Sequence, residues 1–197
     1  MRKFMVFFVV CASFMALNAG STETARQFIL KVTTEALDIV NHDSMSPEEK
    51  RQKLSESISK NLDLERIARI VFSTPKYKYK SLAKDDQLQA QQYIKKKLLE
   101  FYATPGKITA MIGAELKKNK DGKIEKFKVE EKGENFAVTT KFMKNGQESI
   151  VIVWVTDGQK IIDVELLSIS QTMTIKSQEI AEIGDTPLMQ YIDQAMA

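Results

Sequence analysis

The stretch that decides the fold runs from Glu134 to Ser170 and reads ENFAVTTKFMKNGQESIVIVWVTDGQKIIDVELLSIS. Two dipeptides, Asn145-Gly146 and Asp157-Gly158, divide it into three apolar segments. Asn-Gly and Asp-Gly provide the positive φ angles that two-residue hairpin turns require. The middle segment, Ile150 to Val155, is apolar on both faces, which predicts a central strand covered on both sides. The stretch therefore predicts three antiparallel strands joined by two hairpins.

The rest of the chain provides a fourth strand and the helices that cover the sheet. A strand is expected from Ile124 to Val129, which completes a curved four-stranded antiparallel meander. Apolar residues at helical spacing predict helices before and after this meander in the chain. We expect a single α+β domain, with helices over 21–40, 47–62, 64–71, 81–103, 108–116 and 171–183 and a last helix from 188.

Several helix ends carry recognisable capping signals. Ser46 is an expected N-cap, with Pro47 at the first helical position and Glu49 closing a capping box. Asp63 is expected to cap the short third helix. Ser170 or Thr172 is expected to begin the helix that Gly184 ends, and Thr186-Pro187 to cap the last helix.

The first twenty residues have the anatomy of a secretory signal peptide. Arg2 and Lys3 precede an apolar run from Phe4 to Leu17, and small residues follow it. The run is short for a membrane span of about 20 residues, so an uncleaved anchor is the lesser alternative. Cys11, the only cysteine, lies inside the run. We therefore expect residues 1–20 to be removed, leaving a cysteine-free domain over 21–197 that is exported to a bacterial periplasm.

Charge and motif content argue against nucleic-acid binding and against familiar catalysis. The chain has 29 Lys and Arg against 26 Asp and Glu, a net charge of +3, and one histidine, His42. Neither a zinc-ligand set nor a nucleotide-binding or hydrolase motif occurs. Asp163 and Glu165 share one face of a strand, so acid–base chemistry on this pair is an open alternative. A structural role, with Asp163 bonded to backbone groups of the following turn, is the simpler interpretation.

Several short motifs are distributed over most of the mature chain. They are Leu64-Glu65-x-Ile67-Ala68-Arg69-x-Val71, Leu98-Leu99-x-x-Tyr102, Asp163-Val164-x-Leu166-x-x-Ile169-Ser170, Ile175-Lys176-Ser177-Gln178 and Ile183-Gly184-Asp185-x-x-Leu188. Together they resemble the MlaC family, also called the toluene-tolerance family, of periplasmic phospholipid-binding proteins. The chain departs from the family at positions such as Ser168, where the family has glycine, and Lys176, where it has arginine.

The resemblance implies a soluble carrier that is not an enzyme and needs no metal or cofactor. Such a carrier holds a phospholipid by its acyl tails and passes it between an outer-membrane lipoprotein complex and an inner-membrane ABC transporter complex. This role maintains the lipid asymmetry of the outer membrane. A periplasmic interaction module that binds no lipid is the main alternative function, and an enzyme using Asp163 or Glu165 is a third.

The expected lipid site is an apolar cavity between sheet and helices. For each residue the alternative is an ordinary closed core, and only the resemblance favours a cavity. The basic and aromatic loop from Lys76 to Lys80 is either a membrane-facing element or a solvated loop. The expected cavity residues are Phe28, Val32, Leu98, Tyr102, Met111, Phe136, Val138, Phe142, Ile150, Ile152, Trp154, Val164, Leu166 and Met173.

Overall fold

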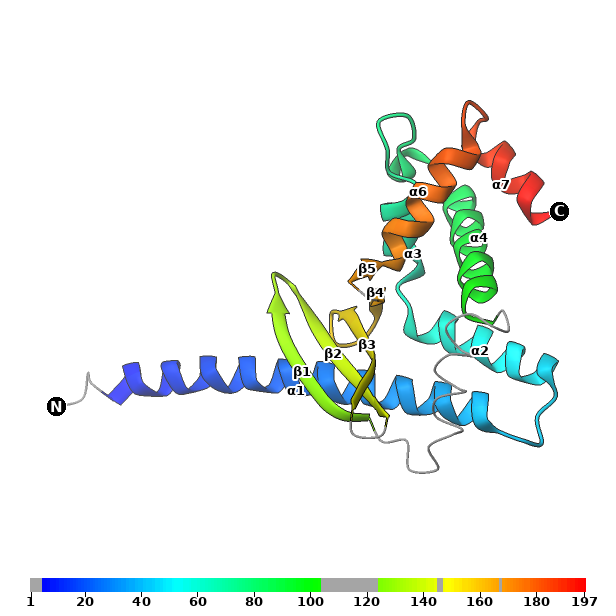
Figure 1. Ribbon diagram of the computed structural model, residues 1–197. Helices are drawn as coiled ribbons and strands as arrows, with labels where there is room; N and C mark the ends of the chain where they lie inside the picture. The colour runs from blue at the N-terminus through cyan, green and yellow to red at the C-terminus, as the bar shows by residue number, and fades with distance from the viewer. Residues whose placement is uncertain (1–4, 104–123, 145–146, 167) are drawn as a thin grey trace.

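The computed structural model describes residues 5–103, 124–144, 147–166 and 168–197, with side chains described from 22 onward except in 101–126, 142–150 and 167. Its order of elements confirms the α+β class: helices, then an antiparallel sheet, then helices (Figure 1). The helices are α1 (Met5–Asn41), α2 (Pro47–Asn61), α3 (Leu64–Val71), the 3-10 turn η1 (Tyr79–Ser81), α4 (Lys84–Ala103), α6 (Gln171–Ile183) and α7 (Leu188–Met196).

The sheet is a meander of five strands in the order β1-β2-β3-β4-β5 rather than the four that the sequence predicts. The extra strand pairs its two residues with the end of β4, where Ile169 lies opposite Leu166. Ser168, between these strands, has φ of 64°, a left-handed conformation that glycine adopts more easily. The strands are β1 (Ile124–Lys132), β2 (Asn135–Lys144), β3 (Gln147–Thr156), β4 (Ile161–Leu166) and β5 (Ile169–Ser170).

The β3–β4 connection has four residues, not the two that Asp157-Gly158 predicts. Thr156 pairs with Ile161, so residues 157–160 form the loop. The Asp157 carboxylate accepts hydrogen bonds from the backbone N–H groups of Gln159 and Lys160, both at 2.8 Å. An aspartate that satisfies its own turn in this way stabilises a longer loop, and Gly158 provides the positive φ of 94°. The other predicted turn, Asn145-Gly146, lies outside the described residues.

Helix α1 covers one face of the sheet, which lies across it in Figure 1. Ala25, Ile29 and Val32 follow one side of α1 at helical spacing and are buried. They pack against the sheet face that carries Val138 and Ile152. Within the described part of the chain, no helix is long and apolar enough to cross a membrane. Helix α1 also begins earlier than the predicted Ser21, at Met5.

The opposite face of β3 is less covered than the sequence predicts. Val151, Val153 and Val155 point to this face and are only partly buried. Helices α3 and α6 contact the sheet along its β4 edge. The central strand is therefore buried on the α1 side and partly exposed on the other.

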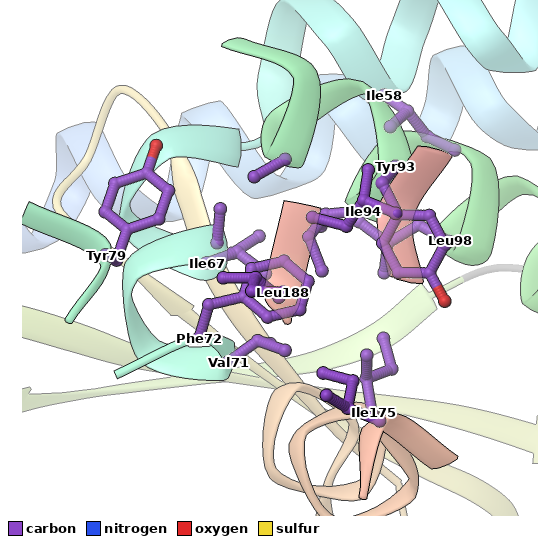
Figure 2. Packing of buried hydrophobic residues seen from close by; sticks show 14 residues of the cluster. Ile58, Ile67, Val71, Phe72, Tyr79, Tyr93, Ile94, Leu98, Ile175 and Leu188 are labelled. Atoms are coloured by element: carbon purple, nitrogen blue, oxygen red, sulfur yellow. The ribbon is translucent and has the colours of Figure 1, made fainter. Parts of the chain in front are cut away.

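The remaining helices form a second core of their own, shown in Figure 2. Their predicted ends are largely confirmed. Ser46 and Glu49 form the capping box of α2, Asp63 caps α3, and Ser170 caps α6 through the Met173 N–H. The buried members of this helical cluster are Ile58, Ile67, Ala68, Val71, Phe72, Tyr79, Ala90, Tyr93, Ile94, Leu98, Ile175, Ile183, Leu188 and Ile192.

One helix start and one helix cap differ from the prediction. The long helix α4 begins at Lys84 rather than Ser81, because Tyr79–Ser81 form the separate turn η1. The last helix is preceded by Pro187, and no side chain caps it. The carbonyl of the preceding Thr186 accepts a hydrogen bond from the Tyr77 hydroxyl at 2.8 Å. The predicted segment over 108–116 lies outside the described residues.

The two cores meet at the segment between α2 and α3. Leu62 packs against both clusters and forms a parallel bridge with Ile161 at the start of β4. The Asp63 N–H donates to the Ile161 carbonyl at 2.9 Å. This segment therefore joins the helical cluster to the sheet, alongside the contacts of α3 and α6 with β4.

Candidate functional site

Most of the predicted cavity residues that the structure describes gather where α1 meets the sheet. We call this group the α1–sheet cluster. Its buried members are Ala25, Ile29, Val32, Val138, Ile152, Ile161 and Val164, and its partly buried members are Phe28, Leu62, Phe127, Val129, Phe136, Trp154 and Leu166. Strand register explains the grouping, because Val138 lies opposite Trp154, which lies opposite Val164, on one face.

The other predicted residues are not part of this cluster. Leu98 is buried in the helical cluster, and Met173 is half exposed on α6. Tyr102, Met111, Phe142 and Ile150 lie outside the described side chains. Leu98 lies on α4 and Met173 on α6. Both helices pack against α3 rather than against the sheet face that α1 covers.

The α1–sheet cluster also contains residues that the sequence analysis did not select. Ala25 and Ile29 precede Val32 at spacings of seven and three residues on α1, and Phe127 and Val129 alternate along β1. These periodicities are visible in the sequence and are the signals that select them. Ile161 joins the cluster because the register of β4 shifts beside Thr156, which no sequence pattern reports.

One polar pair lies within the cluster. The Trp154 Nε1–H donates to the Thr140 hydroxyl at 3.0 Å, and Thr140 is fully buried. A buried indole N–H needs such a partner. Because Thr140 satisfies it, the Trp154 ring adds apolar surface to the cluster without leaving an unpaired donor.

An open hollow of about 380 Å³ adjoins the cluster on α1. Its described lining consists of Glu23, Thr24, Gln27, Phe28 and Lys31. Phe28 belongs both to this lining and to the cluster. The β3–β4 loop lies close by: a Cβ added to Gly158 would lie 4.0 Å from the Thr24 side chain. Phe28 is thus the residue that the hollow shares with the apolar interface between helix and sheet.

The polar side chains around the hollow form pairs along α1. The Arg26 guanidinium lies 3.2 Å from the Glu23 carboxylate and 5.4 Å from the centre of the Phe127 ring. The Gln27 amide donates to Glu23, and this hydrogen bond, with a smaller contribution from Arg26, lowers the pKa of the Glu23 carboxyl. Lys31 lies 4.0 Å from Glu35, the outer limit of an ion pair.

Asp163 has the structural role that the sequence analysis favoured. Its Oδ1 accepts hydrogen bonds from the Val164 N–H at 2.8 Å and from the Thr172 N–H, in the first turn of α6, at 3.0 Å. Glu165 lies 3.3 Å from the Lys132 ammonium. The Asp163 carboxylate therefore ties β4 to the N-terminus of α6, where a negative charge is favourable.

The geometry of the described residues offers no metal site. Among them, no group of three His, Cys, Asp or Glu side chains could hold a metal ion. His42 is exposed and pairs with the Ser44 hydroxyl at 3.1 Å.

The loop from Lys76 to Lys80 binds the turn between α6 and α7. The Lys76 ammonium lies 3.0 Å from Asp185 and donates to the Gly184 carbonyl at 2.6 Å. The Asp185 hydrogen bond raises the pKa of Lys76. Tyr77 donates to the Thr186 carbonyl, and Tyr79 is buried. Both aromatic rings are engaged within the protein, which favours a structural role over contact with a membrane.

A buried polar network joins α4, α6 and α7. Glu179 is 2% exposed and accepts a hydrogen bond from the Tyr93 hydroxyl at 2.6 Å. Its other oxygen lies 3.3 Å from the Lys97 ammonium. The Tyr93 hydroxyl also lies 3.1 Å from that of Tyr191, which donates to Glu182 at 2.7 Å. Burial, and then the hydrogen bond to Glu179, raise the pKa of Tyr93 far above its usual range.

This shift predicts lower stability in alkali. An unfolded tyrosine ionises near pH 10, whereas folded Tyr93 keeps its proton. Above about pH 10 the unfolded state binds fewer protons, so the free energy of unfolding falls as pH rises, by up to about 1.4 kcal/mol per pH unit. Urea denaturation from pH 8 to 11 measures this slope. Tyr93→Phe should flatten it above pH 10, and an unchanged slope in that variant would contradict the assignment.

Comparison with known proteins identifies a family and a protein of similar fold. The chain matches the family model described as MlaC protein over residues 30–194. Its fold is similar to that of a phospholipid-binding protein from Ralstonia solanacearum, solved in complex with a phospholipid, with a TM-score of 0.61 and 17% identity over 86% of this chain and 95% of that one. No curated protein matches the chain. Because the family match spans most of the sequence, this chain belongs to the MlaC family.

Proposed function

We propose that this protein is a periplasmic phospholipid carrier that holds acyl tails at the α1–sheet cluster. It would take phospholipid between an outer-membrane lipoprotein complex and an inner-membrane ABC transporter complex, after removal of its first twenty residues. Family membership supports this role, as does the likeness of fold to a phospholipid-binding protein. The observation that carries it is Phe28, which lines the hollow and also packs into the cluster.

The physical requirement for such a carrier is a shielded apolar surface. Exposing acyl chains to water costs about 0.8 kcal/mol per CH₂, so a lipid with many methylenes crosses an aqueous space only if a protein covers its tails. Large side chains that are only partly buried provide the contact surface. In the α1–sheet cluster these are Phe28, Phe127, Phe136, Trp154 and Leu166.

The helical cluster is the less suitable of the two cores. Its large aromatic side chains, Phe72, Tyr79 and Tyr93, are each at most 2% exposed. Tyr93 packs against Phe72 and Tyr191 and is held by Glu179. Aromatic rings and a buried ion pair already occupy the helical cluster, which leaves little room for a flexible chain. We therefore assign lipid binding to the α1–sheet cluster.

Extraction of lipid from the purified protein tests the proposal. We expect protein recovered from the periplasm of a bacterial host to carry phospholipid, detected by mass spectrometry of an organic extract. Phe28→Glu places a charge where the hollow meets the cluster. We expect this variant to retain at least tenfold less phospholipid while keeping its far-ultraviolet circular dichroism spectrum.

A matched variant separates lipid binding from general damage. Leu99 is also a partly buried apolar residue on a helix, but it packs against the helical cluster. Leu99→Glu should therefore retain phospholipid at the level of the parent protein. A parent protein that carries no phospholipid and takes none up from vesicles would instead support an interaction module with a closed core. Equal lipid loss in both variants would place the tails elsewhere.

A further inference from the structure

The hollow on α1 has opposite charges at its two ends. Glu23, Gln27 and Lys31 line it at intervals of four residues, so they share one side of the helix. The rise of 1.5 Å per residue places the acidic and basic positions about 12 Å apart along the axis. Phe28 lies between them and continues into the α1–sheet cluster. The lining of the hollow thus has an anion and a cation on either side of Phe28.

These two charged groups differ in how firmly they are held. Glu23 accepts hydrogen bonds from Arg26 and Gln27 and is kept ionised by them. A carboxylate has about four acceptor positions, so capacity remains for another donor. Lys31 is more loosely held, because its side chain is 67% exposed and its ammonium lies 4.0 Å from Glu35. Such an exposed pair contributes little, which leaves the ammonium available to an anion.

We propose that the hollow binds the head group of the carried lipid and selects zwitterionic over anionic phospholipids. The Lys31 ammonium and the Gln27 amide hold the phosphodiester, for which lysine acts as a point charge. The Glu23 carboxylate accepts a hydrogen bond from the ammonium at the end of the head group. This inference rests on the proposed function, because the tails must lie in the adjoining cluster for the head group to reach the hollow.

The volume of the hollow agrees with a site that holds the head group while the tails lie in the α1–sheet cluster. At about 380 Å³ it lies near the lower end of ligand pockets, which span about 300–1,000 Å³ for drug-sized molecules. That space suits a head group and the first carbons of the tails rather than two complete acyl chains. An anionic head group without an ammonium, such as that of phosphatidylglycerol, offers Glu23 only neutral hydroxyl donors, whose hydrogen bonds are weaker than those of a charged ammonium.

Competition between two lipids measures the selectivity. Delipidated protein is equilibrated with vesicles containing equal amounts of phosphatidylethanolamine and phosphatidylglycerol, and bound lipid is quantified by mass spectrometry. We expect the parent protein to be enriched in phosphatidylethanolamine. Glu23→Lys should lower the ratio of phosphatidylethanolamine to phosphatidylglycerol about two- to fivefold, the range expected of exposed ion pairs, through weaker binding of phosphatidylethanolamine. Lys31→Glu should lower the binding of both lipids by a similar factor.

Two control variants on α2 match these changes in charge. Glu56 is exposed and accepts a hydrogen bond from Gln52 four residues away, as Glu23 does from Gln27. Lys53 is an exposed lysine on the same helix. Glu56→Lys and Lys53→Glu should leave both the ratio and the total at parent values. Selectivity changes of equal size in the control variants would overturn the inference, because net charge alone would then explain them.

The remaining outcomes separate this inference from the function on which it rests. Full lipid binding with an unchanged ratio in Glu23→Lys overturns head-group selection and leaves the carrier function intact. A parent protein that binds no lipid overturns both. Displacement of bound lipid by free glycerophosphoethanolamine would show that the hollow takes a soluble phosphodiester, and would overturn the assignment to a lipid head group. We expect no displacement, because the free head group gains nothing from the apolar cluster.

Discussion

Replacing Glu179 with alanine is expected to lower the free energy of unfolding by about 3 kcal/mol or more. The carboxylate is 2% exposed and accepts from Tyr93 while lying 3.3 Å from Lys97. Its removal leaves an ammonium without its closest anion and takes from the buried Tyr93 hydroxyl its charged acceptor. Breaking a buried ion pair in this way costs about 3–5 kcal/mol, and the partial exposure of Lys97 places this one near the lower limit.

Urea denaturation at neutral pH measures this loss, with Glu182→Ala as the matched control. Glu182 lies on the same helix and also approaches Lys97, at 3.7 Å, but its side chain is 55% exposed. Exposed ion pairs contribute about 0–1 kcal/mol, so Glu182→Ala should cost no more than about 1 kcal/mol. Equal losses for the two variants would mean that burial does not strengthen the Glu179 interaction.

The second large effect is expected on β3, where adjacent residues point to opposite faces. Ile152 is 1% exposed and lies in the α1–sheet cluster, whereas Val153 points to the partly exposed face. Ile152→Asp both removes a buried apolar side chain, a loss of about 2–5 kcal/mol, and buries an unpaired carboxylate. We expect this variant to fail to accumulate as folded protein, as judged by periplasmic yield and thermal melting.

Val153→Asp is the matched control for the register of the sheet. The same carboxylate is introduced one residue away, but on a face where water reaches it. We expect a folded protein with a lower melting temperature that still carries phospholipid. If Val153→Asp abolished folding and Ile152→Asp did not, the strand would be turned over relative to α1, and the position of the α1–sheet cluster would be wrong.

The elements that local chemistry determines were predictable from the sequence. Ser46 and Glu49 lie three residues apart at the start of an apolar pattern, and their capping box is confirmed. Asp63 and Ser170 likewise cap the helices that follow them. The register of β2 against β3 follows from alternation, because shifting it by one residue would place Val138 and Ile152 on opposite faces of the sheet.

The features that sequence reasoning missed depend on contacts between distant segments. Nothing local indicates that Lys76 binds the α6–α7 turn more than one hundred residues away. Glu179 is an intermediate case. It lies four residues from Ile175 and four from Ile183, both buried, so a glutamate interrupts an apolar stripe. That interruption signals a buried charge, but its partners on α4 and α7 emerge only from the packing.

The candidate site likewise combines features that local sequence patterns predict with features that depend on contacts between distant segments. Alternation along the strands selects the sheet face that α1 covers, and helical spacing selects the side of α1 that packs on it. Leu98 and Met173 were selected by apolar character alone, which does not distinguish one core from another. The hollow itself was not predicted, because Glu23, Gln27 and Lys31 look like an ordinary solvated helix face until the sheet is placed beside them.

Leu62 couples the stability of the helical cluster to that of the sheet. Because it packs into both cores and its neighbour Asp63 bonds to the Ile161 carbonyl, loosening of β4 removes support from the start of α3. The helical half should thus report on events in the sheet half, with amide exchange slowing in α3 whenever a ligand stiffens the sheet. Binding of a ligand at the sheet would then be detectable in α3, at a distance from the ligand itself.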